Sequence, residues 1–452
     1  MSATKNQFSL PGGAPKKRFP AVRIACATKL LPLLLLLTLP AVVQAQYYFT
    51  TNNGTITITG YYGSGGAVVI PGTILVGGVN LPVTCIGGYA FEYHTNLTNV
   101  TIPDTVITIG DAAFEGCTGL TSVTIGSGVT SIGDGAFYWC TSLPNVRIPN
   151  SVTNIGSGAF TYCTSLISVT LGTKVTSIGG DAFLNCYSLT SVTIPDSVTS
   201  LGDAAFEYCV KLTNVTIGTN VTSIGSATFQ GCSSLTSVTI PNRVTSIGDY
   251  AFHQCSSLTS LAIPNNVTNI GVWASDACTA LAQVTIGNNV TSIGDNAFYY
   301  CTNLASITIP YSVTNIGDEA FLYCISLTGV YFKGNAPSIG ASVFDGDNNA
   351  TVYYLPGTTG WGPEFQGGRP LVFWFLPNPL ILNFDSFGVE TNRFGFIISW
   401  ATNIPVVVEA CTNLANHSWS PVSTNPLTDG WSYFSDPRWT NYHARFYRLR
   451  SP

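Results

Sequence analysis

Cysteine recurs at a fixed interval through the middle of this chain of 452 residues. Ten cysteines follow one another every 23 residues without an insertion or deletion: Cys117, Cys140, Cys163, Cys186, Cys209, Cys232, Cys255, Cys278, Cys301 and Cys324. Phenylalanine keeps the same interval over a longer stretch, from Phe91 to Phe344, with one gap at Ser275. A fixed period of this length indicates a solenoid in which each repeat forms one coil. We expect about eleven coils of 23 residues.

The residue pattern within one repeat predicts a coil rich in β-structure. In residues 120–142, Val123 and Ile125 alternate with polar residues, and alternation at period two is typical of a short strand. Pro or Gly follows the strand in each repeat and ends it. We expect the segment around Phe137 to form a short helical turn capped by Asp134. A single coil cannot cover its own apolar side chains, so stability must come from stacking.

The repeat also resembles a known family. Residues 189–209 follow the pattern Leu-x-x-Val-x-Ile-Pro-x-x-Val-x-x-Ile-Gly-x-x-Ala-Phe-x-x-Cys, with Leu201 in the second Ile position. This pattern resembles the BspA-like class of leucine-rich repeats over roughly residues 86–344. The resemblance implies a leucine-rich-repeat array with a curved parallel sheet on its concave side. It also implies a secreted or cell-surface module for adhesion and interaction, although repeat scaffolds carry whatever surface their variable positions provide.

Residues outside the repeats predict export and two flanking units. Basic residues precede an apolar run from Leu30 to Val43 that ends in a small-residue cleavage pattern, which is typical of a secretory signal peptide. The run is too short and too rich in proline for a membrane span. The expected organisation is a signal peptide (1–45), an N-terminal β cap (46–85), the solenoid (86–355), a linker (356–376) and a small β-sandwich-like C-terminal module (377–452).

Composition argues against several functions. Only 9% of residues are charged and the net charge is −5, whereas nucleic-acid binding needs clustered Lys and Arg. The histidines are scattered, and no Gly-x-Ser-x-Gly elbow or recurring Ser-His-Asp arrangement is present. We therefore expect neither a nucleic-acid partner, nor an enzyme, nor a cofactor.

The regular Cys and Asp columns raise the question of disulfides or metals. Cysteines of stacked coils point the same way, so we expect buried free thiols, with disulfides as the alternative in an exported chain. No Cys-x-x-Cys pair or adjacent His completes a zinc site. The Asp column is interrupted, for example at Ser157 and Gly180, whereas calcium needs six to eight oxygens around one point. No metal is expected.

Two surfaces remain as candidate binding sites. The outward strand column is rich in Thr and contains Arg147 and Tyr331. It is either a ligand surface or ordinary soluble strand surface. The two positions before each Cys carry aromatic residues: Tyr138, Trp139, Tyr162, Tyr208, Tyr299, Tyr300 and Tyr323. Such rings can stack on sugars or anchor a protein, although partly buried packing on the convex side would also explain them. We expect Trp273 to fill the core volume left by Ser275.

The sequence as a whole predicts a secreted or cell-surface adhesion scaffold that binds a protein or an extracellular-matrix ligand through the repeats. One alternative is a structural surface-layer or spacer protein attached by its C-terminal module, whose closing segment, 445–450, resembles the tails of some exported bacterial repeat proteins. Another alternative is a protein that binds cell-surface glycans through the aromatic positions.

Overall fold

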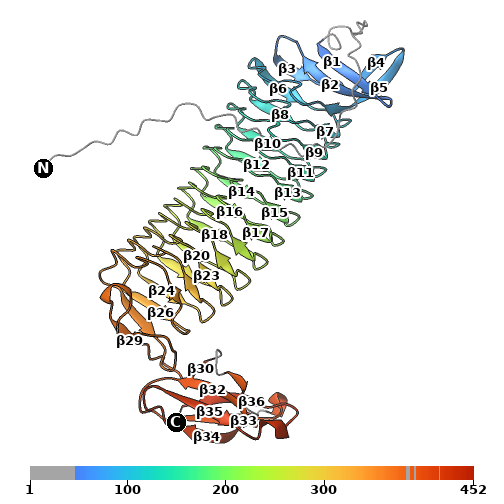
Figure 1. The fold of residues 1–452 in the computed structure, drawn as a ribbon. Helices are drawn as coiled ribbons and strands as arrows, with labels where there is room; N and C mark the ends of the chain where they lie inside the picture. Colours follow the sequence, from blue (N-terminus) through green and yellow to red (C-terminus); the bar gives the residue numbers. More distant parts are fainter. Residues whose placement is uncertain (1–45, 383–386, 391–392, 417, 452) are drawn as a thin grey trace, which may run out of the picture.

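The computed structural model describes residues 46–382, 387–390, 393–416 and 418–451 (Figure 1). The expected signal peptide lies outside these residues. Most of the chain winds into one long array of coils, with the N-terminal strands at one end and the C-terminal sheets at the other. The array is the β-rich solenoid that the 23-residue period predicts.

Each regular coil contributes two parallel strands. The longer strands form one column: β3 (Gly66–Val69), β6 (Leu97–Thr101), β8 (Ser122–Thr124), β10 (Asn145–Arg147), β12 (Ser168–Thr170), β14 (Ser191–Thr193), β16 (Asn214–Thr216), β18 (Ser237–Thr239), β20 (Ser260–Ala262), β22 (Gln283–Thr285), β24 (Ser306–Ile309), β26 (Gly329–Phe332), β28 (Thr351–Tyr354) and β29 (Leu371–Phe373). The two-residue strands form the other: β7 (Thr108–Ile109), β9 (Ser131–Ile132), β11 (Asn154–Ile155), β13 (Ser177–Ile178), β15 (Ser200–Leu201), β17 (Ser223–Ile224), β19 (Ser246–Ile247), β21 (Asn269–Ile270), β23 (Ser292–Ile293), β25 (Asn315–Ile316) and β27 (Ser338–Ile339).

Strand pairing follows the sequence period. Val146 of β10 pairs with Val169 of β12, one period later, and Ile155 of β11 pairs with Ile178 of β13. Within the described residues the longer column holds fourteen strands. Stacking therefore continues beyond the regular repeats, to β3 at one end and to β28 and β29 at the other. β29 and the short 3-10 helix η1 (Gln366–Gly368) lie within the expected linker, 356–376.

The segments around the phenylalanines are not helical, which corrects the expected helical turns. The N–H groups of Gly135, Phe137 and Trp139 donate to carbonyl oxygens of the next coil at 2.8–2.9 Å. Gly135 and Trp139 adopt left-handed backbone angles, with φ of +61° and +60°. A helix would bond these N–H groups within its own segment, so the inter-coil ladder replaces it. The carboxylate of Asp134 likewise accepts the N–H of Ser157 in the next coil, at 2.8 Å, and caps no helix.

A stack of phenylalanine rings runs through one continuous core from Tyr47 to Phe365. Neighbouring rings, such as Phe137 and Phe160, are fully buried and nearly parallel, with centroids 5.2 Å apart. Tyr61 covers the first ring of the stack at 5.1 Å. Because each coil buries a ring against the next, the stacking that stabilises the array is distributed along its whole length.

The gap in this stack is not filled by Trp273, and that expectation is wrong. Trp273 is half-buried on the turn segment, outside the core, and its ring contacts Tyr250 and Tyr299. A left-handed φ of +57° holds Trp273 on the surface side. Ser275 takes the phenylalanine position and is 1% exposed.

The cysteine column is buried, as predicted. The thiol of Cys140 donates to the carbonyl oxygen of Phe114 at 3.3 Å, and Cys163 bonds Phe137 in the same way. All twelve cysteines in the described part of the chain are free thiols. Burial raises the pKa of Cys163 to about 12, because the thiolate would lose its hydration.

Four strands cover the first coil: β1 (Tyr47–Asn52), β2 (Thr55–Tyr61), β4 (Thr73–Val76) and β5 (Val79–Ile86). β1 pairs antiparallel with β2 and β4 with β5, whereas β2 and β5 pair in parallel and lead into the short-strand column. At this end of the array, hairpins thus replace the coils.

The C-terminal module consists of two antiparallel sheets around a shared core that includes Phe396, Val408 and Phe434. The first sheet contains β30 (Leu380–Leu382), β31 (Gly388–Glu390), β32 (Arg393–Ser399) and β35 (Trp431–Asp436). The second contains β33 (Val406–Cys411), β34 (Ser420–Asn425) and β36 (Phe446–Arg450), and the 3-10 helices η2 (Leu414–Asn416) and η3 (Trp439–Asn441) lie in the connections. Strand β36, the closing segment of the chain, is bound in place because Glu409 pairs with both Arg448 and Arg450.

Candidate functional site

The outward strand column is an exposed, hydroxyl-rich face along most of its length. Thr124, Thr170 and Thr216 are exposed, and Arg147 projects from β10 into solvent. Arg147 forms no ion pair with any described residue. The character of the face changes at its C-terminal end, where Tyr331 takes the threonine position.

Tyr331 belongs to an aromatic platform that also contains Tyr353 and Trp374. The rings of Tyr331 and Tyr353 stack with centroids 4.7 Å apart and an interplanar angle of 11°. The indole of Trp374 lies 5.0 Å from Tyr331 and packs against a small cluster formed by Leu355, Leu382 and Ile397. All three platform rings are half-buried, so part of each remains accessible.

A pocket of about 440 Å³ adjoins this platform, with Trp374 in its lining. It extends over the turns that follow β20, β22, β24 and β26, and its polar lining residues are Asn265, Thr285, Asn288, Thr308 and Lys333. Of the described residues that line the pocket, only Lys333 carries a charge. We refer to it as the platform pocket.

The predicted aromatic residues on the turn segments form two clusters, which together we call the aromatic ridge. In the first, Tyr138, Trp139 and Tyr162 lie with ring centroids 5.5–6.1 Å apart. In the second, Tyr299 contacts Tyr300 and Tyr323 at 6.2 and 6.0 Å. Tyr208 belongs to neither cluster and accepts a hydrogen bond from Gln230 at 3.2 Å.

Sequence reasoning missed two members of the second cluster. The rings of Tyr250 and Trp273 stack at 6.4 Å with an interplanar angle of 3°, and Trp273 continues to Tyr299 at 5.5 Å. Both residues lie two positions before the phenylalanine position of their coil, whereas the predicted set lies one or two positions after it. That earlier column is mostly Gly, Ala and acidic residues, and Tyr89, Tyr250 and Trp273 are its three large rings.

One column of the ridge has an unusual backbone. The residue two positions after each phenylalanine position has a positive φ, and in three coils it is glycine: Gly116, Gly231 and Gly346. In six other coils the same left-handed position is occupied by a Tyr or Trp, with φ between 54° and 60°: Tyr93, Trp139, Tyr162, Tyr208, Tyr300 and Tyr323. A bulky residue is rare in this conformation.

Polar side chains lie near the second cluster, with His253 and Asp276 on two of its coils and Glu207 between it and the first cluster. His253 Nδ1 lies 2.6 Å from Asp276 Oδ2, and the Asp276 side chain is almost fully buried. Burial raises the pKa of Glu207 to about 7; the charge of Asp181 raises it further, and His253 opposes the shift. Within the described residues, no group of three or more His, Cys, Asp or Glu side chains is arranged to hold a metal ion.

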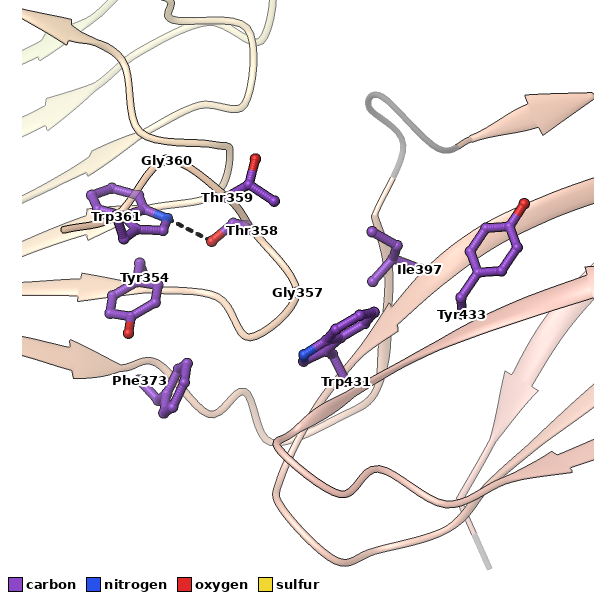
Figure 2. A pocket seen from close by; sticks show the side chains of 10 residues that line it. All are labelled: Tyr354, Gly357, Thr358, Thr359, Gly360, Trp361, Phe373, Ile397, Trp431 and Tyr433. Atoms are coloured by element: carbon purple, nitrogen blue, oxygen red, sulfur yellow. Dashed lines mark hydrogen bonds between the residues drawn. The ribbon is translucent and has the colours of Figure 1, made fainter. Parts of the chain in front are cut away.

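A second pocket, of about 590 Å³, lies between the end of the solenoid and the C-terminal module (Figure 2). Tyr354, Trp361 and Phe373 line the solenoid side, and Ile397, Trp431 and Tyr433 line the module side. The indole N–H of Trp361 donates to Thr358 at 2.7 Å. The wall is therefore mainly aromatic, and it is shared by two units.

No helix in the described residues combines the length and the apolar character needed to cross a membrane. The stacked parallel coils, with one apolar position per strand and an invariant interval, define a leucine-rich-repeat solenoid. The family described as "BspA type Leucine rich repeat region (6 copies)" matches residues 84–213 and 199–328, more than half of the chain. The chain belongs to this BspA-type leucine-rich repeat family.

Solved structures of bacterial leucine-rich repeat proteins are similar to it. A leucine-rich repeat protein from Bacteroides ovatus is 27% identical, with 73% of this chain and 97% of that one covered and a TM-score of 0.47. A leucine-rich cell surface protein from Faecalibacterium prausnitzii is 29% identical over 68% and 93%, with a TM-score of 0.41. The pneumococcal vaccine antigen PcpA is 20% identical over 71% and 88%, with a TM-score of 0.48. Among curated proteins, none matches this chain.

Proposed function

We propose that this protein is a non-enzymatic adhesion scaffold that acts outside the cell and binds a protein or extracellular-matrix ligand through the aromatic ridge. The observation that carries the proposal is the placement of Tyr and Trp at left-handed backbone positions that glycine fills in other coils. A non-glycine residue in this conformation costs about 1–2 kcal/mol relative to glycine. Local strain of this kind concentrates at functional sites.

Burial within the protein does not offset this cost at every position. Trp139, Tyr300 and Tyr323 remain 43%, 46% and 45% exposed. A partner that covered these rings would remove apolar surface from water, and Trp and Tyr dominate the binding energy of many protein interfaces. The ridge therefore has the chemistry of a set of anchors on a rigid support.

Packing within the array explains why some of these positions carry an aromatic residue. A Cβ on Gly231 would lie 2.3 Å from the ring of Tyr208, and a Cβ on Gly346 would lie 2.5 Å from that of Tyr323. These two tyrosines therefore cover the glycine of the following coil. Trp139 and Tyr300 are followed in the column by Tyr162 and Tyr323 instead, so they are the strongest candidates for partner contacts.

The expected signal peptide and the low content of charged residues support a place outside the cell. The similar leucine-rich protein from Faecalibacterium prausnitzii is described as a cell surface protein. We infer export followed by display or release, with the C-terminal module available for attachment.

The experiment is a binding screen with purified residues 46–452 against an array of extracellular-matrix proteins. Trp139→Ala and Tyr300→Ala should each weaken a hit by about tenfold or more, which is typical of an interface anchor. Tyr62→Ala is the matched control, because Tyr62 is 54% exposed and lies in the N-terminal cap. Absence of any matrix hit, combined with self-assembly into sheets, would replace adhesion with a structural role.

A further inference from the structure

We propose that the platform pocket is a binding site for a carboxylated sugar, that is, an oligosaccharide with a uronic or sialic acid unit. The site lies at the C-terminal end of the outward strand face and shares no residue with the aromatic ridge that carries the proposed function. It is built from the rings of Tyr331, Tyr353 and Trp374 and from the pocket that contains Lys333.

The rings provide a stacking surface. The rings of Tyr331 and Tyr353 are stacked nearly parallel on adjacent strands, so each covers one face of the other, and Trp374 stands at an angle of 53° to Tyr331. Trp374 lines the pocket and therefore offers the aromatic surface inside it, with the two tyrosines beside it. The C–H face of a pyranose ring is apolar, and an aromatic ring covers it while the hydroxyl groups at the sugar's edge stay free to bond.

The polar groups beside the rings match the hydroxyl groups of a sugar. Asn265 and Asn288 lie on successive coils, and the Oδ1 of Asn265 accepts the backbone N–H of Asn288 at 2.9 Å. This bond orients the Asn265 amide and leaves its NH₂ group without a partner among the described residues. Thr285 and Thr308 add hydroxyl groups from adjacent strands. A sugar hydroxyl both donates and accepts hydrogen bonds, and the pocket offers groups of both kinds.

The positive charge of Lys333 favours an acidic sugar over a neutral one. Lys333 is exposed and has no ion-pair partner among the described residues, and the other lining residues are neutral. The chain as a whole has a net charge of −5, so the positive charge of this pocket differs from the overall charge of the protein. A carboxylate on the sugar would pair with the Lys333 ammonium group through a charge-assisted hydrogen bond, which a neutral sugar cannot form. The volume of about 440 Å³ lies within the usual range for small-ligand sites.

The test is isothermal titration of residues 46–452 with four saccharides. Trigalacturonic acid and 3′-sialyllactose are the acidic probes, one for each source of the carboxylate, and maltotriose and lactose are their neutral counterparts. We expect at least one acidic probe to bind about tenfold or more tightly than its neutral counterpart, and we expect added salt to weaken it. Equal affinity for an acidic probe and its counterpart, or no binding of either acidic probe at millimolar concentration, overturns the proposal.

Variants locate the site. Lys333→Gln and Tyr331→Ala should each weaken the acidic probe about tenfold or more, whereas Lys174→Gln, an exposed lysine several coils away, should leave the affinity unchanged. If Tyr331→Ala unfolds the end of the array, saturation-transfer NMR on the unaltered protein provides the second measurement. The sugar protons of one ring face should then receive most of the transfer, and uniform transfer contradicts stacking. Loss of matrix binding in ridge variants, with sugar binding intact, would separate this site from the proposed adhesion surface.

Discussion

The imidazole Nδ1 of His253 lies 2.6 Å from the Oδ2 of Asp276, and this contact joins two successive coils in the second cluster of the aromatic ridge, those of Tyr250 and Trp273. The side chains are 18% and 5% exposed, so little water competes with the pair. The ring of Tyr250 contacts the imidazole of His253 edge-on. On the next coil, the ring of Trp273 contacts that of Tyr299. A buried polar contact between two coils of the second cluster therefore helps to set the relative position of its aromatic residues.

Loss of the carboxylate at position 276 should destabilise the array. In Asp276→Ala the imidazole of His253 loses this contact in a poorly hydrated place, and a buried polar group left without a partner costs about 1–3 kcal/mol. Asp249→Ala is the control, because Asp249 is exposed and accepts one backbone N–H, from Val272 at 2.8 Å. Urea unfolding should show the larger shift for Asp276→Ala. Equal shifts for the two variants would show that the His253 contact adds nothing to an ordinary inter-coil bond.

Replacement of Glu207 by Gln should change how stability depends on pH. Burial raises the folded-state pKa of Glu207 from 4.5 to about 7. The wild type therefore has the full contribution of the protonated carboxyl below pH 4.5 and loses it as the pH rises to 7. Because the side chain is only partly buried, solvent screening reduces the effect to about 1 kcal/mol. Glu207→Gln should unfold later than the wild type at pH 8 and together with it at pH 4.

Asp196→Asn serves as a control, because the pKa of Asp196 is shifted in the opposite direction to that of Glu207. Hydrogen bonds from the backbone N–H and the side chain of Thr219 lower the pKa of Asp196. Its contribution is thus present at neutral pH and disappears as the pH falls through the lowered value. Thermal unfolding across pH 3–8 should show the two variants diverging from the wild type in opposite directions. Parallel curves for Glu207→Gln and the wild type would mean that Glu207 titrates alike in both states.

The coil stack could be predicted because an uninterrupted period leaves only one register. Val146 must pair with Val169 once Cys140 and Cys163 occupy equivalent places, and the structure has this pairing. The turn backbone could not be predicted in the same way. Nothing in the residue type of Trp139 or Tyr162 indicates a left-handed φ, since the ladder to the next coil imposes it.

The platform also escaped sequence reasoning, for a different reason. Tyr331 was identified alone, because its partner Tyr353 follows it by 22 residues, one short of the period. Trp374 comes from the segment that was expected to be a linker, and β29 brings it to the sheet. Irregular spacing at the end of an array thus hides a contact that a fixed interval would reveal. Sequence reasoning placed the candidate residues on the surface but could not assemble them.

A methyl group at Gly231 should destabilise its coil for two separable reasons. Gly231 has a φ of +70°, and a Cβ there would meet the Tyr208 ring at 2.3 Å. Gly77 has a similar φ, +59°, with open space around its Cβ position. Gly77→Ala should therefore lose about 1–2 kcal/mol from backbone strain alone, and Gly231→Ala about 1–3 kcal/mol more from overpacking. Adding Tyr208→Ala to Gly231→Ala should recover part of the unfolding temperature. No recovery in the double variant would mean that the ring moves aside freely.

The buried thiols should be inert in the folded protein. Desolvation raises the pKa of Cys117 and of Cys163 to about 12, from an ordinary value of 9. Since the thiolate is the reactive form, alkylation by iodoacetamide at pH 8 should be negligible before unfolding and complete in guanidinium chloride. Intact-mass analysis after each treatment counts the modified cysteines. The same shifts predict that stability falls as the pH rises from 9 to 12, because the unfolded chain ionises first. Cysteines that resist alkylation even in denaturant, and become reactive only after reduction, would show instead that the column forms disulfides.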